Sequence, residues 1–278
     1  MMRVPGHSPG YDRARVYLLL SSPALHLTTH TSILSQNLII HNMPTTELAI
    51  IPMKAGSKPG DPNDLSAQVL SDAATVLRQQ DGMQQIHFGT QHESPDVLQM
   101  MISPYFKNRQ FLQADELTKT TDWDSLKHHQ AFMTSSSYGP FMQRFGQVIS
   151  DPTTVSLTHV DFSPAGNLAK ALSAPITEIA TFYFDGAPPS DYGSGVEKAE
   201  QWIGGVGGGY LGLAWGTTHE EVERDGVKGK AAVVAIGWQS YEAHMAFRGR
   251  EDFKEKIGLL RSSSKAVEMH HVAFMQAL

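Results

Sequence analysis

Histidine is the residue type in this chain with the clearest capacity for chemistry. The sequence holds 13 histidines and no cysteine. An imidazole has an ordinary pKa of about 6.5, so a well-placed histidine can act as a general acid or base near neutral pH. The lack of cysteine excludes thiolate nucleophiles, disulfides, cysteine-bound zinc and iron–sulfur clusters, and it is compatible with a reducing compartment.

Three pairs of histidines recur in matched surroundings, which indicates an internal duplication. Four matches follow the same order in both parts of the chain: Glu47 and Ala49 with Glu178 and Ala180; Gly89, Thr90, His92 and Glu93 with Gly216, Thr217, His219 and Glu220; Trp123, Ser125, His129, Ala131 and Phe132 with Trp238, Ser240, His244, Ala246 and Phe247; His159, Val160 and Phe162 with His271, Val272 and Phe274. Matches in one order are hard to obtain by chance, so we predict two copies of one unit.

Each copy predicts the element order βαββαβ. The apolar runs at residues 48–53, 84–92, 117–123 and 155–162 are typical strands of the first copy, and those at 179–184, 210–219, 231–238 and 267–274 match them. Helices are expected at 64–79, at 195–203, and after Ser125 and Ser240, whose hydroxyls can cap a first turn. We expect an insertion at 94–115, a shorter one at 221–230, and a linker at 163–175.

This order predicts an α+β fold made of two tandem ferredoxin-like βαββαβ repeats, at residues 46–165 and 176–278. Each four-stranded antiparallel sheet would leave one apolar face uncovered by its own helices. We therefore expect the two sheets to pack face to face as an intramolecular α+β barrel. Trp123 and Trp238 are expected to be packing residues, because both copies keep one beside a helix start.

The segment from Trp123 to Met133, followed by residues 137–141 with the sequence Ser-Tyr-Gly-Pro-Phe, resembles the helix motif of fungal proteins of the dimeric α+β barrel superfamily. Within it, the chain is similar to the antibiotic-biosynthesis-monooxygenase-like and stress-responsive-barrel members, over about residues 46 to 278. The resemblance implies the barrel fold. It does not select an activity, because the superfamily includes cofactor-free monooxygenases, cyclases, isomerases, dehydratases, haem enzymes and proteins without known chemistry.

The matched histidines differ in the roles that their positions favour. His129 and His244 lie one turn into a helix and are expected to be structural, and His92 and His219 are expected at capped turns. Strand alternation leaves open whether His159 and His271 line the barrel, where they would be good bases, or lie under the helices as core residues. The catalytic candidates are His271, then its counterpart His159, and His87, which Ala214 replaces in the second copy.

Aromatic residues favour the second copy as the place of a substrate pocket. Tyr183, Trp215 and Tyr241 stand where the first copy has Pro52, Phe88 and Leu126, and their polar tips could orient a ring compound. We expect these three residues and Phe88 to bind an apolar or aromatic small molecule. The alternative is ordinary divergence between two cores.

Other motifs do not support a cofactor or a metal. The glycine-rich run at 204–212 follows a predicted helix and precedes a strand, which is the reverse of the order in a dinucleotide-binding site. The S-x-x-K match at 262–265 lacks the partner motifs of its enzyme class. The adjacent histidine pairs at 128–129 and 270–271 must point apart, so we predict no cofactor and no metal site.

Composition limits the partners. A net charge of -6 argues against a nucleic-acid surface, and no apolar run approaches the roughly 20 residues of a membrane span. Residues 1–45 are predicted to be an extension, either unstructured or a targeting segment, because they hold Arg3, Arg13 and Arg15 against a single acidic residue, Asp12, with many serine, threonine and histidine residues. We expect a cytoplasmic protein, with mitochondrial targeting and homodimer formation left open.

The favoured function is a cofactor-independent small-molecule enzyme of secondary metabolism: a cyclase, isomerase, dehydratase or monooxygenase. A histidine or tyrosine in a dry cavity would supply the acid or base. Two alternatives remain open, namely a ligand-binding or stress-responsive protein without catalysis and a haem-binding enzyme with a histidine ligand.

Overall fold

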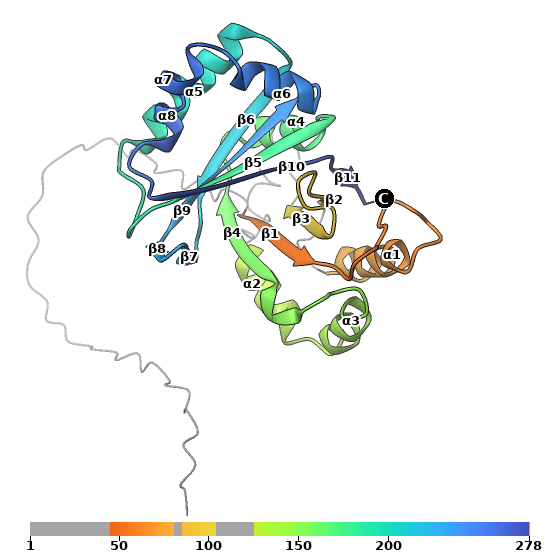
Figure 1. Cartoon of the computed structure of the whole chain (residues 1–278). Coiled ribbons are helices and arrows are strands. Elements are labelled where there is room, and N and C mark those ends of the chain that lie inside the picture. Colours follow the sequence, from red (N-terminus) through yellow and green to blue (C-terminus); the bar gives the residue numbers. More distant parts are fainter. Residues whose placement is uncertain (1–44, 81–84, 104–124, 278) are drawn as a thin grey trace, which may run out of the picture. The chain divides into compact units, whose positions relative to one another are not determined.

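A computed structural model describes residues 45–80, 85–103 and 125–277, which belong to one compact unit spanning His41–Leu278. Figure 1 shows its helices and strands. Among the described residues no helix has the length and apolar character needed to cross a membrane. The tail up to residue 44 and the predicted strand at 117–123 lie outside the described residues, and so does Trp123.

The first half of the unit contains one antiparallel sheet and its helices. Its elements are β1 (Thr45–Pro52), α1 (Leu65–Arg78), β2 (Gln85–Thr90), β3 (Val97–Ser103), α2 (Ser125–Met133), α3 (Tyr138–Phe145), a short 3-10 turn (Pro152–Thr154) and β4 (Ser156–Asp161). The strand order is β2-β3-β1-β4, and β11 (Met275–Gln276) from the chain's end extends the sheet beside β2.

The second half repeats this arrangement. Its elements are β5 (Ile176–Tyr183), α5 (Tyr192–Val206), β6 (Tyr210–Thr217), the hairpin of β7 (Val222–Arg224) and β8 (Val227–Gly229), β9 (Ala231–Trp238), α6 (Tyr241–Arg248), α7 (Phe253–Lys256), α8 (Gly258–Arg261) and β10 (Ala266–Val272). The order β10-β5-β9-β6 is the ferredoxin-like order of the first half read from its other edge. The α+β class and both antiparallel sheets are therefore confirmed.

Two predicted boundaries were wrong. The third strand of the first half is β3, which lies inside the segment expected to be an insertion. This strand pairs on both sides, with β1 and β2, and six of its seven residues are buried. A strand buried on both faces has no polar alternation, so VLQMMIS lacked the pattern that marks a half-exposed strand.

The expected linker contains a helix, α4 (Ala165–Leu172). Its buried residues Leu168, Ala171 and Leu172 pack with Val160 of β4 and Ala235 of β9 in a core cluster between the two sheets. The helix therefore fills part of the space that two facing sheets would otherwise leave empty.

One face of each sheet is covered by the helices of the same half. In the first half, apolar side chains of α1, α2 and α3 pack on β1, β2 and β3, and in the second half α5 to α8 pack on β5, β6 and β9. Helix α1 starts at a capping residue, Asp64, whose carboxylate accepts from the Ser66 backbone N–H. The helix faces of both sheets are thus closed by apolar packing, and any site there must lie within that packing.

The edges of the two sheets meet at matched places. The backbone N–H of His219 donates to the carbonyl of His159 at 2.8 Å, and that of His92 donates to the carbonyl of His271 at 2.7 Å. A Cβ atom at Gly89 or Gly216 would collide with the backbone of the other half, so both junctions need glycine. These bridges join two separate sheets, so the described residues do not form one closed barrel.

Candidate active site

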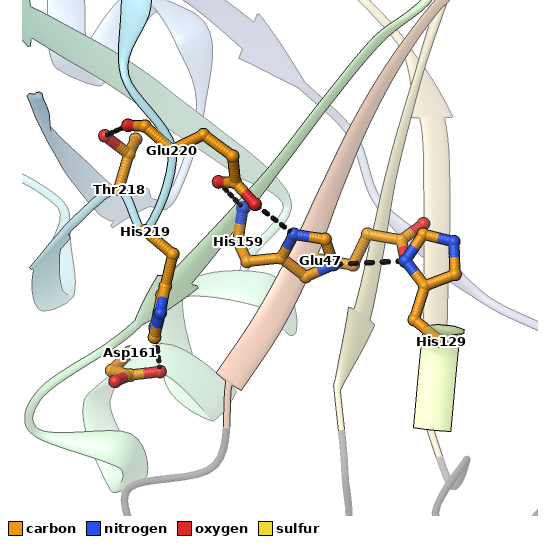
Figure 2. A network of polar contacts seen from close by, with 7 residues as sticks. All are labelled: Glu47, His129, His159, Asp161, Thr218, His219 and Glu220. Atoms are coloured by element: carbon orange, nitrogen blue, oxygen red, sulfur yellow. Dashed lines mark hydrogen bonds and ion pairs between the residues drawn. The ribbon is translucent and has the colours of Figure 1, made fainter. Parts of the chain in front are cut away.

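Four polar side chains meet on the helix side of the first sheet (Figure 2). His129 Nδ1 lies 2.9 Å from Glu47 Oε2 and 3.2 Å from His159 Nε2. The third separation, from His159 Nε2 to Glu47 Oε2, is 3.6 Å. Glu220 holds the far side of His159, because its carboxylate accepts from the Nδ1–H at 2.6 Å and from the backbone N–H at 2.8 Å.

Regular secondary structure places these groups. Glu47 of β1 and His159 of β4 are directly opposite across an antiparallel pair, so their side chains stand side by side on one face. His129 comes down onto them from α2. Glu220 comes from the segment before β7 in the second half. We call Glu47, His129 and His159 the first-half triad.

The second half assembles the same residue types. Glu178 and His271 are opposite across β5 and β10, and His244 of α6 contacts both. Glu93 of the first half accepts from the Nδ1–H of His271 at 2.5 Å and from its backbone N–H at 2.9 Å. Each half therefore supplies one glutamate that orients the strand histidine of the other half.

The two groups differ in the direction of the contacts. His244 uses Nε2 toward Glu178, at 3.2 Å, and Nδ1 toward His271, at 2.6 Å. The contacts of the second-half group therefore run in sequence from Glu178 to His244, then to His271 and Glu93. In the first-half triad a single atom of each residue, His129 Nδ1, His159 Nε2 and Glu47 Oε2, lies within 3.6 Å of the other two instead.

The two groups differ in the protonation states that their surroundings favour. Burial acts to raise the pKa of Glu47, but bonds from His129 and His159 outweigh it and lower that pKa to about 2. Burial alone would lower the pKa of His159, and the carboxylates of Glu47 and Glu220 raise it instead. Deeper burial raises the pKa of Glu178 to about 7 and lowers that of His244 to about 3. Glu47 therefore favours its ionised form and His159 its protonated form, whereas burial favours the neutral forms of Glu178 and His244.

A cavity of about 320 Å³ opens from the first-half triad. It lies between the first sheet and its helices, and all three triad residues line one part of it. Most of the remaining lining is apolar: Ala49, Ile51, Leu77, Met100, Ile102, Phe132, Tyr138, Phe141, Phe145, Ile149, Val155 and Leu157. An apolar cavity with a few converging polar groups is the usual form of a small-molecule site.

The matching space of the second half is nearly filled. Its cavity measures only about 70 Å³. Trp202, Trp238, Phe247 and Phe253 pack against one another there, with ring centroids 4.7–6.3 Å apart. Among the described residues, only the first half thus combines the polar group with room for a ligand.

A second cavity, of about 440 Å³, lies between the two sheets and is more polar. Gln99 and His270 meet there, with the amide oxygen of Gln99 3.0 Å from His270 Nε2. His87 is buried on the same side of β2, and its Nδ1 has no partner among the described residues. Burial lowers the pKa of His87, so this ring favours its neutral form.

The structure places the predicted catalytic residues on different faces. His159 and His271 lie under the helices, which was the core alternative, yet both bond to side chains rather than to backbone groups. His87 is paired with Met101, whose side chain belongs to the core cluster between the two sheets. The expected helix histidines, His129 and His244, turn out to be members of the polar groups and not isolated core residues.

The predicted substrate-binding aromatics do not form one site. Tyr183 lies between the sheets and donates to Glu268 at 3.0 Å, whereas Trp215 packs on Tyr192 on the helix side. Tyr241 packs against His271 and His92. Phe88 packs on the core of the first half. Of these, Tyr241 is the one whose ring packs on the ring of a predicted catalytic residue, His271, among the described contacts.

The four glutamates were missed as site residues although they stand inside the matched motifs. Glu47 with Glu178, and Glu93 with Glu220, were aligned, but only the histidines were considered for chemistry. A matched carboxylate beside a matched histidine was the available signal. The prediction of no metal site rested on adjacent histidine pairs. The groups with potential ligand atoms within 4.8 Å of one another, Glu47 with His129 and His159 and Glu178 with His244 and His271, instead combine two strands and a helix.

The chain resembles known proteins in structure and not in sequence. No protein-family model matches the chain, and no curated protein matches its sequence. Similar solved structures include a proposed monooxygenase from Lactobacillus acidophilus (9% identity, 84% of this chain and 96% of that chain, TM-score 0.47). Others are a proposed monooxygenase from Fusobacterium nucleatum (10%, 84% and 94%, 0.48) and an anthrone oxidase-like protein (12%, 85% and 94%, 0.49). Likeness at this level carries no argument about activity.

Proposed function

We propose that this protein is a small-molecule enzyme whose active site is the first-half cavity. The observation that carries the proposal is the junction of an apolar cavity of about 320 Å³ with the first-half triad. This size is at the lower end of ordinary ligand sites, which suits a compound of two or three fused rings. The aromatic lining from Phe132, Phe141 and Phe145 would hold the rings.

The proposed reaction is proton transfer at an acidic group of the bound compound, of the kind needed for isomerisation, cyclisation or dehydration. The compound's polar substituent would lie at the first-half triad, because the other walls offer few polar partners. His129 would accept the proton, because it borders the cavity and its orientation is fixed by contacts to Glu47 and His159. Glu220 would act as a positioning residue, since it touches His159 and not the cavity.

This proposal moves the site from the second half, which the aromatic residues of the sequence favoured, to the first. The reason is space: the second-half group is covered by Trp238, which stacks on His244 with centroids 4.7 Å apart and donates to Glu178. A substrate there would have to displace a fully buried side chain.

The test uses 2-tetralone, an apolar fused-ring ketone whose C–H next to the carbonyl is weakly acidic. Hydrogen–deuterium exchange at that carbon, followed by NMR in deuterated buffer, reports proton transfer without requiring knowledge of the natural substrate. We expect saturable, enzyme-catalysed exchange that falls about a hundredfold or more in His129→Gln. Ala49→Phe, which fills the cavity, should abolish both binding and exchange while the protein stays folded.

The matched control is Tyr241→Phe, at the second-half group, which should leave exchange unchanged. Saturable binding without catalysed exchange would favour a ligand-binding protein instead. If 2-tetralone and related ring compounds do not bind, or if Ala49→Phe binds them as well as the original protein, the cavity is not the site.

A further inference from the structure

The three atoms of the first-half triad have the separations of ligands around a single metal ion. Glu47 Oε2, His129 Nδ1 and His159 Nε2 form a triangle with sides of 2.9, 3.2 and 3.6 Å. The point in their plane that is equidistant from all three lies about 1.9 Å from each, so an ion slightly out of the plane would have bonds of about 2.0–2.1 Å, as Zn²⁺ does with nitrogen and oxygen.

We propose that Glu47, His129 and His159 bind one divalent transition-metal ion, with Zn²⁺ as the ion that the donor set fits best. Two imidazoles and one carboxylate are a common protein ligand set for Zn²⁺ and related ions when further positions stay open for water or substrate. All three residues line the cavity, so the open positions would face the bound compound.

Glu220 supplies a second, independent feature of a metal site. Its carboxylate accepts the Nδ1–H of His159, which leaves Nε2 free to coordinate. A carboxylate behind a ligating histidine fixes the ring's tautomer and orientation and strengthens it as a ligand. The bond from Glu220 to the His159 backbone N–H holds this carboxylate in place.

The second-half group is an internal comparison with the same residue types and a different geometry. One potential ligand atom from each of Glu178, His244 and His271 also lies within 4.8 Å of the others. The contacts there use both nitrogens of His244, however, whereas His129 meets both of its partners through Nδ1 alone. Trp238 also donates to Glu178 Oε2 at 3.2 Å and covers the group. We therefore assign the ion to the first half alone.

The inference deepens the proposed function, because a bound ion would polarise the oxygen of the substrate and make the neighbouring C–H more acidic. In that case His129 and His159 would hold the ion, and a hydroxide at one of its open positions, rather than His129, would accept the proton and become water. The metal site can nevertheless be tested without any substrate, so its failure and that of the proposed function are distinguishable.

The test is a titration of the chelator-treated full chain with Co²⁺, whose visible absorbance reports nitrogen and oxygen ligation, followed by competition with Zn²⁺. We expect Co²⁺ to bind at one site and Zn²⁺ to displace it. Binding at this site should be lost in Glu47→Gln and His129→Gln, and weakened about 10- to 100-fold in Glu220→Gln. Thermal unfolding of each variant checks folding, and having two ligand variants keeps the test usable if one fails to fold.

Glu178→Gln is the matched control, since it makes the same change in the second-half group and should leave Co²⁺ binding intact. The inference is overturned if Co²⁺ and Zn²⁺ do not bind, if Glu47→Gln and His129→Gln bind them normally, or if Glu178→Gln removes the site. Metal binding together with failure of 2-tetralone exchange would support the metal site and count against the proposed reaction.

Discussion

Glu93 of the first half bonds His271 of the second half, so Glu93→Gln is predicted to cause a sizeable loss of stability. Glu93 accepts two hydrogen bonds from His271, one from the ring and one from the backbone. The amide of glutamine has a single acceptor oxygen, so it can replace only one of them and turns an N–H₂ toward the other donor. His271 is fully buried, and one of its N–H groups would therefore lose its partner.

The magnitude follows from these two bonds. A hydrogen bond to a charged group contributes about 1.5–3 kcal/mol, and a buried orphaned donor costs about 1–3 kcal/mol. The Glu93 side chain is 36% exposed, which screens its charge, so the lower part of the range applies. We expect a loss of about 2 kcal/mol, which corresponds to a Tm lower by about 4–8 °C for a unit of this size.

The effect should depend on pH with a definite sign. Burial acts to raise the pKa of Glu93, but the bonds from His271 outweigh it, so the folded-state pKa lies below the ordinary value of 4.5. The contribution of Glu93 is then present above about pH 4.5 and is lost as the pH falls through the lowered pKa. The difference between the original protein and Glu93→Gln should shrink on going from about pH 7 to about pH 3.

Circular dichroism during heating and during urea titration gives both quantities. Glu221→Gln, which removes a charge from an exposed neighbour of the matching Glu220, is the control and should change Tm little. An unchanged Tm for Glu93→Gln, or a difference from the original protein that persists at acidic pH, would refute the argument that these two bonds join the halves.

Three further predictions follow from burial and composition. Trp238→Ala should lower the free energy of unfolding by about 3–5 kcal/mol, because the residue is 1% exposed. A variant that is as stable as the original protein in a urea titration would contradict this. Burial raises the pKa of Glu178 to about 7, so stability should fall as the pH rises from 4.5 through 7, and Glu178→Gln should flatten that profile in denaturant titrations. Deletion of residues 1–42 should change Tm by less than about 2 °C, and loss of soluble protein would show that the extension is needed.

The repeated motifs carried the fold prediction. The pairing of Glu47 with Glu178 and of His159 with His271 placed strands in matched positions, and both sheets have the strand order that this requires. Strand β3 was missed because the match of Trp123 with Trp238 predicts the third strand at 117–123 and leaves 94–115 as an insertion. The corresponding β9 is also buried throughout, and its apolar run did predict a strand.

The candidate site was harder to predict because its geometry depends on side-chain direction. Whether His159 faced the helices or the other sheet depended on which face each sheet turns outward, and strand alternation is the same in both cases. The distinction between a triangle in one half and a chain in the other depends on which nitrogens of His129 and His244 face their partners. The matched positions alone make the two groups look equivalent.

The presence of a roomy cavity in one half and a filled one in the other has a consequence for how such a protein can diverge. In an assembly of two identical subunits every substitution appears twice, so a tryptophan that fills one cavity fills both. Here the halves are encoded separately within one chain, and Trp202 and Phe253 can stabilise the second half without any cost to the first. The arrangement therefore allows the second half to be retained as a scaffold while the cavity of the first half changes to fit other ligands.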